Sequence, residues 1–192
     1  MMDRELRKFR HDIKGHFLGM GYLLEKQNYE ELTCYFNDLQ DSFAFQERLY
    51  FSGNLIIDSI INYDLHNLCA SHVQKNVSGV LTDVSTVSSI DLCTIFSNML
   101  SNAIHAVNQC PPQEMPQLTI SFDYGSQYFS ITIVNSISDD YSANRTIKKR
   151  NTSDRNHGYG IYKMKNICEK YNGIFHQSMQ TKQIITTVYL PL

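Results

Sequence analysis

Hydrophobic positions at the start of the chain repeat with the period of an α-helix. Leu6 and Ile13 share one heptad position, and apolar residues three or four positions away complete a stripe that predicts a helix over residues 3–27. Asn28, followed by Glu31, matches a capping box and predicts the start of a second helix with the same spacing. Two such helices form a hairpin too small to bury its own stripe, so we expect it to pair with a second copy as a dimeric four-helix bundle. Packing of the stripe against the rest of the chain is the alternative.

The pattern changes after residue 52, where helical and strand periods alternate. Two pairs of segments show period-two alternation across short polar turns, which is typical of antiparallel β-hairpins. We therefore predict an α+β chain with a hairpin domain over residues 1–52 and, over residues 53–192, an α/β sandwich of one mostly antiparallel sheet with helices on one face. The expected helices are 53–73, 89–109 and 160–172, and the expected strands are 77–84, 117–124, 128–136, 173–180 and 183–192.

Composition narrows the choice of partners and compartment. With 192 residues and a net charge of −2, the chain lacks the basic surplus that favours nucleic acid, so we expect no nucleic-acid partner. The five cysteines are scattered and form no C-x-x-C pair, which argues against a zinc site or a disulfide framework and favours a reducing, cytoplasmic location. No apolar stretch approaches the roughly 18 residues that span a bilayer, and the charged start MMDRELRKFRHD does not resemble a signal peptide.

Two asparagines share one face of the predicted helix over residues 89–109. Asn98 and Asn102 stand four residues apart among mostly apolar neighbours. Buried amides need hydrogen-bond partners or ligands, and amide oxygens suit Mg²⁺, which takes its remaining ligands from water and phosphates. Taken alone, the pattern fits a polar stripe on a surface helix better.

Glycines and a strand-end amide supply further candidate contacts. Gly158 and Gly160, after His157, stand where a loop becomes a helix, a place where backbone N–H groups can approach a phosphate. Asn135 ends an apolar strand, where a side-chain amide can recognise the donor and acceptor edge of a purine. A flexible helix entry and a strand-terminating turn are the simpler interpretations of these residues.

The first helix carries two histidines with different expected environments. On the heptad that starts at Leu6, His11 falls on the outer face beside Asp12, whereas His16 falls on the seam. An exposed imidazole can attack a phosphorus atom, and Asp12 can hold or accept the proton of the other ring nitrogen. The alternative is that His11 is an ordinary surface histidine with an acidic neighbour.

The order of these motifs resembles that of the sensor histidine kinases, and most closely the GHKL-type kinases of the peptide-pheromone (accessory gene regulator) class. The resemblance spans nearly the whole chain. No single motif is specific, but the combination is. The segments that carry it are FRHDIK at 9–14, GNLIIDSIINY at 53–63, NMLSNAIHA at 98–106 and TSDRNHGYGIY at 152–162.

The resemblance implies a dimerisation and phosphoacceptor hairpin followed by a Bergerat-type ATP-binding domain. It implies that the kinase uses ATP and Mg²⁺, that His11 is phosphorylated and that Asp12 is its proton partner. It also implies that residues 136–157 form a lid over the nucleotide. The residues implied at the nucleotide are Asn98 and Asn102 for Mg²⁺ and phosphate, Asn135 for adenine, and His157, Gly158 and Gly160 for phosphate.

The implied partners are a second copy of the chain, bound through the hairpin, and the receiver domain of a response regulator. A membrane contact would come only through a sensor domain that precedes this chain. The sequence departs from related kinases at two positions. Gly15 stands where relatives often carry Asn or Thr for phosphatase action, and Asp154 stands where they often carry Lys. They leave open a degenerate kinase that acts as a dimeric ATP-binding interaction module. A third hypothesis, an ATPase, needs a carboxylate near Asn98, and the helix offers only Asp91, two turns away.

Overall fold

The computed structural model describes residues 2–41, 50–68, 72–81, 84, 86–138 and 159–192, except the side chains of residues 2–13 and 40–41. The chain separates into two compact units, residues 1–46 and 47–192. This division falls a few residues before the boundary at residue 52 that the sequence suggests. No helix among the described residues is both long and apolar enough to cross a lipid bilayer.

The first unit contains two helices that contact each other, α1 (Met2–Glu25) and α2 (Tyr29–Asp41). Asn28 caps the start of α2: the Glu31 N–H donates to its Oδ1 over 3.3 Å, and its Nδ2 donates to Glu31 Oε2 over 2.6 Å, while its own N–H donates to the carbonyl oxygen of Leu23. Between the helices, His16 Nδ1 lies 2.8 Å from the hydroxyl oxygen of Tyr35. The predicted start of the second helix at Asn28 is therefore confirmed, although the Glu31 side chain contacts the Asn28 side chain rather than its N–H, and His16 faces the second helix as predicted.

Large apolar side chains of the first unit remain exposed in the single chain. Phe17, Leu18 and Tyr22 on α1, with Tyr29 and Phe36 on α2, keep between 46% and 67% of their surface accessible. Exposed apolar side chains gathered on one pair of helices commonly mark an interaction surface. The contact between α1 and α2 therefore buries only part of the apolar stripe seen in the sequence.

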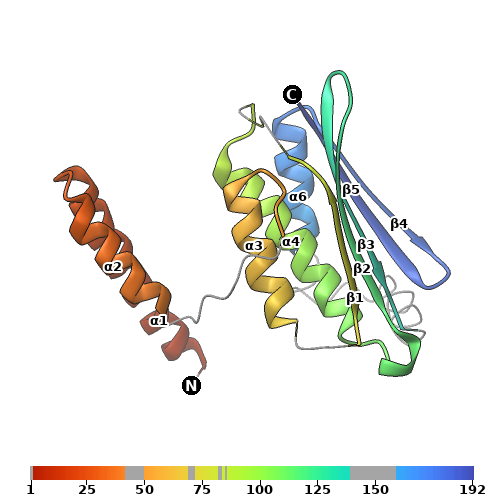
Figure 1. Cartoon of the computed structure of the whole chain (residues 1–192), viewed down its shortest axis with the longest axis horizontal. Helices are drawn as coiled ribbons and strands as arrows, with labels where there is room; N and C mark the ends of the chain where they lie inside the picture. Colours follow the sequence, from red (N-terminus) through yellow and green to blue (C-terminus); the bar gives the residue numbers. More distant parts are fainter. Residues whose placement is uncertain (1, 42–49, 69–71, 82–83, 85, 139–158) are drawn as a thin grey trace. The chain divides into compact units, whose positions relative to one another are not determined.

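The second unit is a five-stranded mixed sheet with helices on one face, shown in Figure 1. The strand order is β1-β2-β3-β5-β4, in which β1 runs parallel to β2 and the other neighbours are antiparallel. This arrangement confirms the prediction of one mostly antiparallel sheet with helices on one face. The elements are α3 (Leu55–Asn67), β1 (Gln74–Gly79), α4 (Ser89–Val107), the 3-10 helix η1 (Pro112–Glu114), β2 (Gln117–Tyr124), β3 (Tyr128–Ser136), α6 (Tyr159–Lys170), β4 (Ile174–Gln180) and β5 (Gln183–Pro191).

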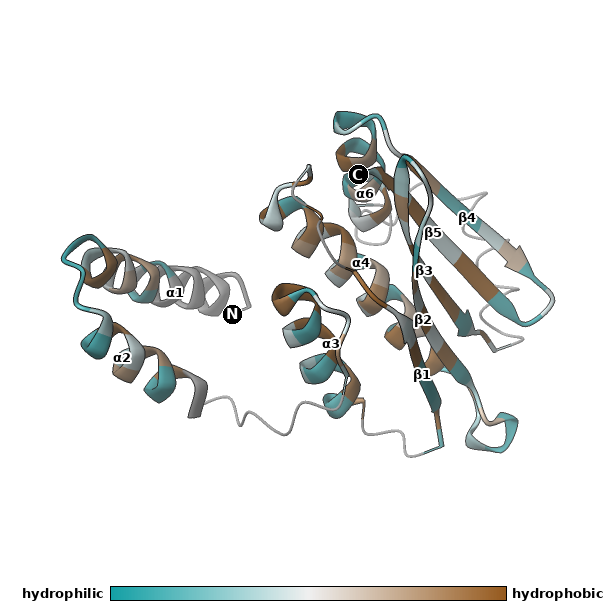
Figure 2. Cartoon of the chain, turned by 45° about the horizontal axis from the view of Figure 1, so that its top comes forward, coloured by the Kyte–Doolittle hydropathy of each residue, from teal (hydrophilic) through white to brown (hydrophobic). Residues whose placement is uncertain are grey.

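Alternation along the central strands directs one face of the sheet to the helices. On β3, Phe129, Ile131 and Ile133 are buried, while the residues between them are half-buried. Figure 2 shows hydrophobic positions concentrated on α4 and on the central strands. The rings of Phe96 on α4 and Phe122 on β2 meet with centroids 6.1 Å apart. The core therefore lies between the sheet and α4, which holds α4 in a fixed place against the strands.

Strand β1 differs from its prediction. It runs over Gln74–Gly79 rather than over residues 77–84, and its parallel ladder begins with the pairing of Gln74 and Gln117. It ends at Gly79, where φ is +83° and a Cβ would overlap the carbonyl oxygen of Phe122. The partner strand thus determines where β1 begins, and the glycine allows the close approach at its end.

Helix α3 is shorter than predicted, because it ends at Asn67 rather than at residue 73. At that end Lys75 of β1 donates hydrogen bonds to the carbonyl oxygens of Leu65, over 2.8 Å, and Leu68, over 3.2 Å. A lysine on the neighbouring strand thereby satisfies carbonyl groups that a helix end leaves without partners. Two carbonyl groups at the end of α3 thus keep hydrogen-bond partners where the helix stops.

Candidate functional site

Helix α4, which carries the N-x-x-x-N motif, and helix α6, which begins within the H-G-x-G motif, meet at Asn98 and Gly160. The half-buried Asn98 donates from Nδ2 to the carbonyl oxygen of Thr94, 2.6 Å away, within α4. This bond directs Oδ1 toward the first turn of α6. A Cβ added to Gly160 would lie 2.7 Å from Asn98 Oδ1, a contact that real Cβ atoms essentially never make. Glycine is therefore required at 160 as long as the Asn98 amide keeps this orientation.

The second asparagine of the motif has a different environment. Asn102 lies one turn further along α4 and is exposed. The structure thus brings Asn98 to α6 and leaves Asn102 on the surface of the same helix. The two residues stand one turn apart on α4, as their spacing predicts.

Asn135 is buried at the end of β3, with 3% of its surface accessible. Its place in the alternation puts it on the face of the sheet that carries Phe129, Ile131 and Ile133, toward the helices. Its Nδ2 donates to the carbonyl oxygen of Ser136 over 3.0 Å. The amide is therefore oriented with Oδ1 as the end that can accept a further hydrogen bond.

Other predicted site residues lie outside the described part of the chain. His157, Gly158 and Asp154 belong to residues 139–158, which include most of the predicted lid. His11 and Asp12 lie within the helical span of α1, and their side chains are outside the description. Their predicted roles stay predictions.

The carboxylate on α4 that comes closest in sequence to Asn98 is already engaged. Asp91 Oδ2 accepts hydrogen bonds from Lys170 Nζ at 2.6 Å, from the Tyr171 hydroxyl at 2.7 Å and from the Ser88 hydroxyl at 3.0 Å. These contacts, with that from Lys170 the strongest, hold the pKa of Asp91 below its usual value. A carboxylate held in this way braces α4 against the end of α6 and is a poor base for activating water.

The donor set available for a metal ion consists of amides rather than acids. Among the described residues, no group of three His, Cys, Asp or Glu side chains could hold a metal ion. The amide oxygens of Asn98 and Asn102 are hard ligands, which fit Mg²⁺ when phosphate oxygens and water complete its shell. The space left by the missing Cβ of Gly160 lies directly beside Asn98 Oδ1. The residues present therefore fit Mg²⁺ carried by a phosphate ligand.

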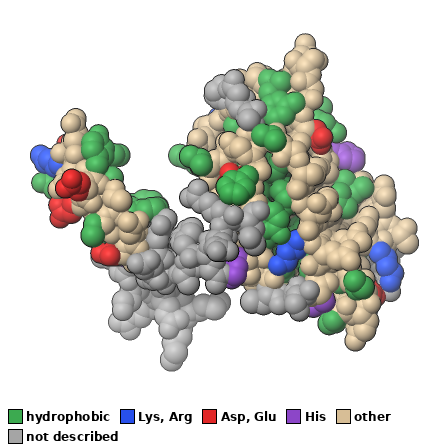
Figure 3. Space-filling view, in the orientation of Figure 1, with side chains coloured by type: hydrophobic (Ala, Val, Ile, Leu, Met, Phe, Trp, Pro, Cys, Tyr) green, Lys and Arg blue, Asp and Glu red, His purple; other side chains and the backbone are tan. Residues whose placement is uncertain are grey.

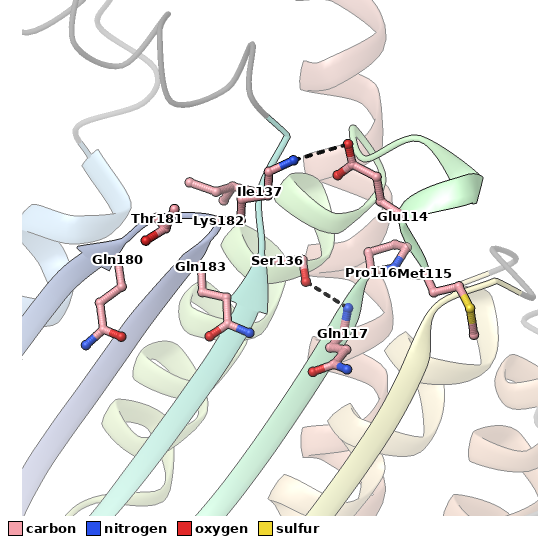
Figure 4. Close-up of a pocket in the computed structure, with 10 residues that line it drawn as sticks. All are labelled: Glu114, Met115, Pro116, Gln117, Ser136, Ile137, Gln180, Thr181, Lys182 and Gln183. Carbon is pink, nitrogen blue, oxygen red and sulfur yellow. Dashed lines mark hydrogen bonds and ion pairs between the residues drawn. The ribbon is translucent and has the colours of Figure 1, made fainter.

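A separate hollow of ≈ 490 Å³ lies at the ends of the strands and is shown in Figure 4. Its lining comes from η1 and from the ends and turns of β2, β3, β4 and β5, and none of it comes from α4 or α6. Lys182 and Glu114 form an ion pair across it, with 3.6 Å between Nζ and Oε1. The hollow is therefore distinct from the contact between Asn98 and Gly160.

Basic side chains are sparse among the described residues on one face of the second unit. On the face of the second unit seen in Figure 3, few Lys and Arg side chains appear, and they are spread among hydrophobic and uncharged polar ones. This distribution agrees with the low net charge of −2.

Residues 87–191, which include α4, Asn135 and Gly160, match the GHKL domain family. The chain belongs to the GHKL domain family. Its second unit therefore has the α+β ATP-binding fold of that family, and the GHKL match includes both helices that form the contact between Asn98 and Gly160.

Solved structures show the same fold at low sequence identity. The catalytic domain of histidine kinase ThkA, in a nucleotide-free form, aligns with a TM-score of 0.53 and 13% identity over 76% of this chain and 96% of that one. The histidine kinase domain of the blue-light activated kinase EL346 of Erythrobacter litoralis aligns with a TM-score of 0.50 and 13% identity over 79% and 67%. No curated protein matches the chain in sequence. At these identities the likeness establishes that the GHKL unit has the fold of histidine kinase catalytic domains.

Proposed function

We propose that the chain is the core of an ATP-dependent protein-histidine kinase of a two-component system, of the peptide-pheromone class. The second unit binds Mg-ATP, and the γ-phosphoryl group passes to His11 of the first unit. The observation that carries this proposal is the contact between Asn98 and Gly160, because it joins the two predicted phosphate-binding motifs in one place. Membership of the GHKL family and the kinase-like fold support it.

The nucleotide would lie against α4 and the start of α6. Asn98 and Asn102 would hold Mg²⁺, which when bound neutralises charge on the phosphates. The glycines at 158 and 160, with His157, would bring backbone and side-chain donors to the phosphates. Transfer of this kind depends mainly on positioning and charge neutralisation, so the chain needs no strong base near the phosphates.

Asn135 would bind the adenine. Its amide oxygen is the free acceptor end, because Nδ2 is directed to the carbonyl of Ser136. An acceptor at this place suits the exocyclic amino group of adenine and does not suit the carbonyl of guanine. Asn135 would thereby favour ATP over GTP.

His11 is the proposed nucleophile, and Asp12 would accept or hold the proton on the other ring nitrogen. The ring nitrogen attacks the γ-phosphorus, the bond to the bridging oxygen breaks, and ADP leaves. The phosphoryl group then moves to an aspartate of a response-regulator receiver domain. His16 is not a candidate for the nucleophile, because it is half-buried and its ring is hydrogen-bonded to the Tyr35 hydroxyl.

The exposed apolar side chains of α1 and α2 would form the interface of a homodimer. We propose that the kinase core acts in the cytoplasm and is tied to the membrane through a sensor domain preceding this chain. The near-neutral charge gives it no reason to bind nucleic acid.

The test is phosphorylation with labelled ATP and Mg²⁺. We expect base-stable, acid-labile label that is lost in His11→Ala and kept in His16→Ala. Label that persists in His11→Ala would contradict the assignment of the nucleophile. Binding of ATP without any label would favour the dimeric interaction module, and steady release of free phosphate without protein label would favour an ATPase.

A further inference from the structure

The segment just before α3 is bound to that helix through its backbone. Tyr50 donates its N–H to Asn62 Oδ1 over 3.0 Å and accepts at its carbonyl from Asn62 Nδ2 over 2.8 Å. One side chain thus satisfies both backbone groups of a residue twelve positions earlier. Asn62 Nδ2 also donates to the carbonyl oxygen of Asp58 over 2.7 Å, which fixes the amide on the helix.

A buried carboxylate makes the next contact. Asp58, with 4% of its surface accessible, accepts at Oδ1 from the N–H of Ser52 over 2.5 Å and from its hydroxyl over 2.6 Å. Ser52 is completely buried, and its carbonyl oxygen accepts from the N–H of Leu81, which follows β1. A carboxylate is buried at such a place only when hydrogen bonds compensate for its lost hydration.

These contacts attach residues 50–52 to two separate parts of the second unit. Asp58 and Asn62 stand one turn apart on α3, and Leu81 belongs to the segment after β1. Helix α3 itself begins at a separate cap, where Asn54 Oδ1 accepts from the N–H groups of Ile56 and Ile57. The cap organises the helix, whereas the Asp58 and Asn62 side chains organise the chain that leads into it.

We propose that Asp58 and Asn62 are positioning residues that fix where the chain enters the ATP-binding unit. This inference rests on the proposed function, because phosphoryl transfer needs ATP and the phosphoacceptor histidine to be aligned, and we expect that alignment to depend on a fixed entry of the chain at residues 50–52. Neither residue belongs to the contact between Asn98 and Gly160, so we expect ATP affinity to stay the same when they are replaced.

The experiment separates transfer from binding in the full chain. Asn62→Leu removes both bonds to Tyr50 at similar volume, and Asp58→Asn keeps an acceptor for Ser52 but removes the charge. We expect the single-turnover rate of phosphoryl transfer from ATP to His11 to fall at least tenfold in Asn62→Leu and less in Asp58→Asn. The dissociation constant of Mg-ATP should stay within twofold of the wild type.

Asn54→Ala is the matched control, because it removes the cap of the same helix and leaves the bonds to Tyr50 and Ser52 in place. Its transfer rate should stay within twofold of the wild type. Hydrogen exchange should show faster exchange of the Tyr50 amide in Asn62→Leu only. An unchanged transfer rate in Asn62→Leu, or an equal loss of ATP affinity, overturns the positioning role. A wild-type chain that binds ATP and takes up no label refutes the proposed function itself.

Discussion

Gly160→Ala tests whether the contact between α4 and α6 forms the nucleotide site. The change adds one methyl group, and in an ordinary helix it stabilises the protein by about 1 kcal/mol because alanine restricts the unfolded chain more than glycine. Here the new Cβ would lie 2.7 Å from Asn98 Oδ1 and 3.6 Å from Asn98 Cγ. Ordinary contact begins at 3.4 Å, so the amide must move by several tenths of an ångström.

The size of the effect follows from the bonds of Asn98. Rotation of its amide breaks the 2.6 Å bond from Nδ2 to Thr94, at a net cost of about 1 kcal/mol. The displaced Oδ1 would also lose its contact with the metal and phosphate charge, worth about 1.5–3 kcal/mol. The second loss appears only in binding, so we expect the dissociation constant of Mg-ATP to rise about 10- to 150-fold.

The assay is calorimetric titration with Mg-ATP together with urea denaturation. Gly21→Ala is the control, since nothing lies within 4 Å of a Cβ at that helical glycine. It should leave ATP affinity unchanged. Adding Gly160→Ala to an Asn98→Ala background should cost little, because the overlapping atoms are gone. If Gly160→Ala binds ATP as tightly as the wild type and is more stable, our account of the site is wrong.

Three further predictions concern single side chains. Asn135→Asp sets a carboxylate against the carbonyl of Ser136, so the free energy of unfolding should fall by about 1–3 kcal/mol, and urea melts showing a gain would contradict the hydrogen bond. Because the pKa of Asp91 is lowered, its ionised form stabilises the fold above the ordinary carboxyl range; Asp91→Asn should therefore be less stable than the wild type at pH 7, and the gap should close as acid protonates Asp91. Burial raises the pKa of Cys168 to about 11, so at pH 8 a disulfide reagent should modify the exposed Cys34 rapidly and Cys168 only after unfolding.

Local patterns predict the antiparallel part of the sheet well. The segments 117–124 and 128–136 are observed as β2 and β3 with the same bounds, since each alternates and a short polar turn joins them. Strand β1 is the contrast, because QKNVSG has little alternation and its place is set by a parallel partner that starts at Gln117. Parallel pairing depends on a distant segment, and no local signal marks its register.

In the candidate site, too, local spacing predicts some features and only the fold shows the others. The spacing of Asn98 and Asn102 predicts a shared helix face, but only the fold shows that Asn98 is the one that meets α6. Asp58 was missed, because within LIIDSIIN it looks like an ordinary first-turn acid. An acidic residue among isoleucines is a signal of a buried carboxylate that needs hydrogen-bond partners. Its partner, Ser52, lies before the start of the helix.

Strand β4 forms one edge of the sheet, and none of its seven residues, Ile174–Gln180, is charged. Ile174 and Met179 on it keep 60% and 50% of their surface exposed. Edge strands without lysine, proline or a bulge are templates for another strand, so concentrated solutions of this protein should associate edge to edge. The substitution His176→Lys, at an exposed position of β4, should reduce that association and leave α4 and α6 unchanged.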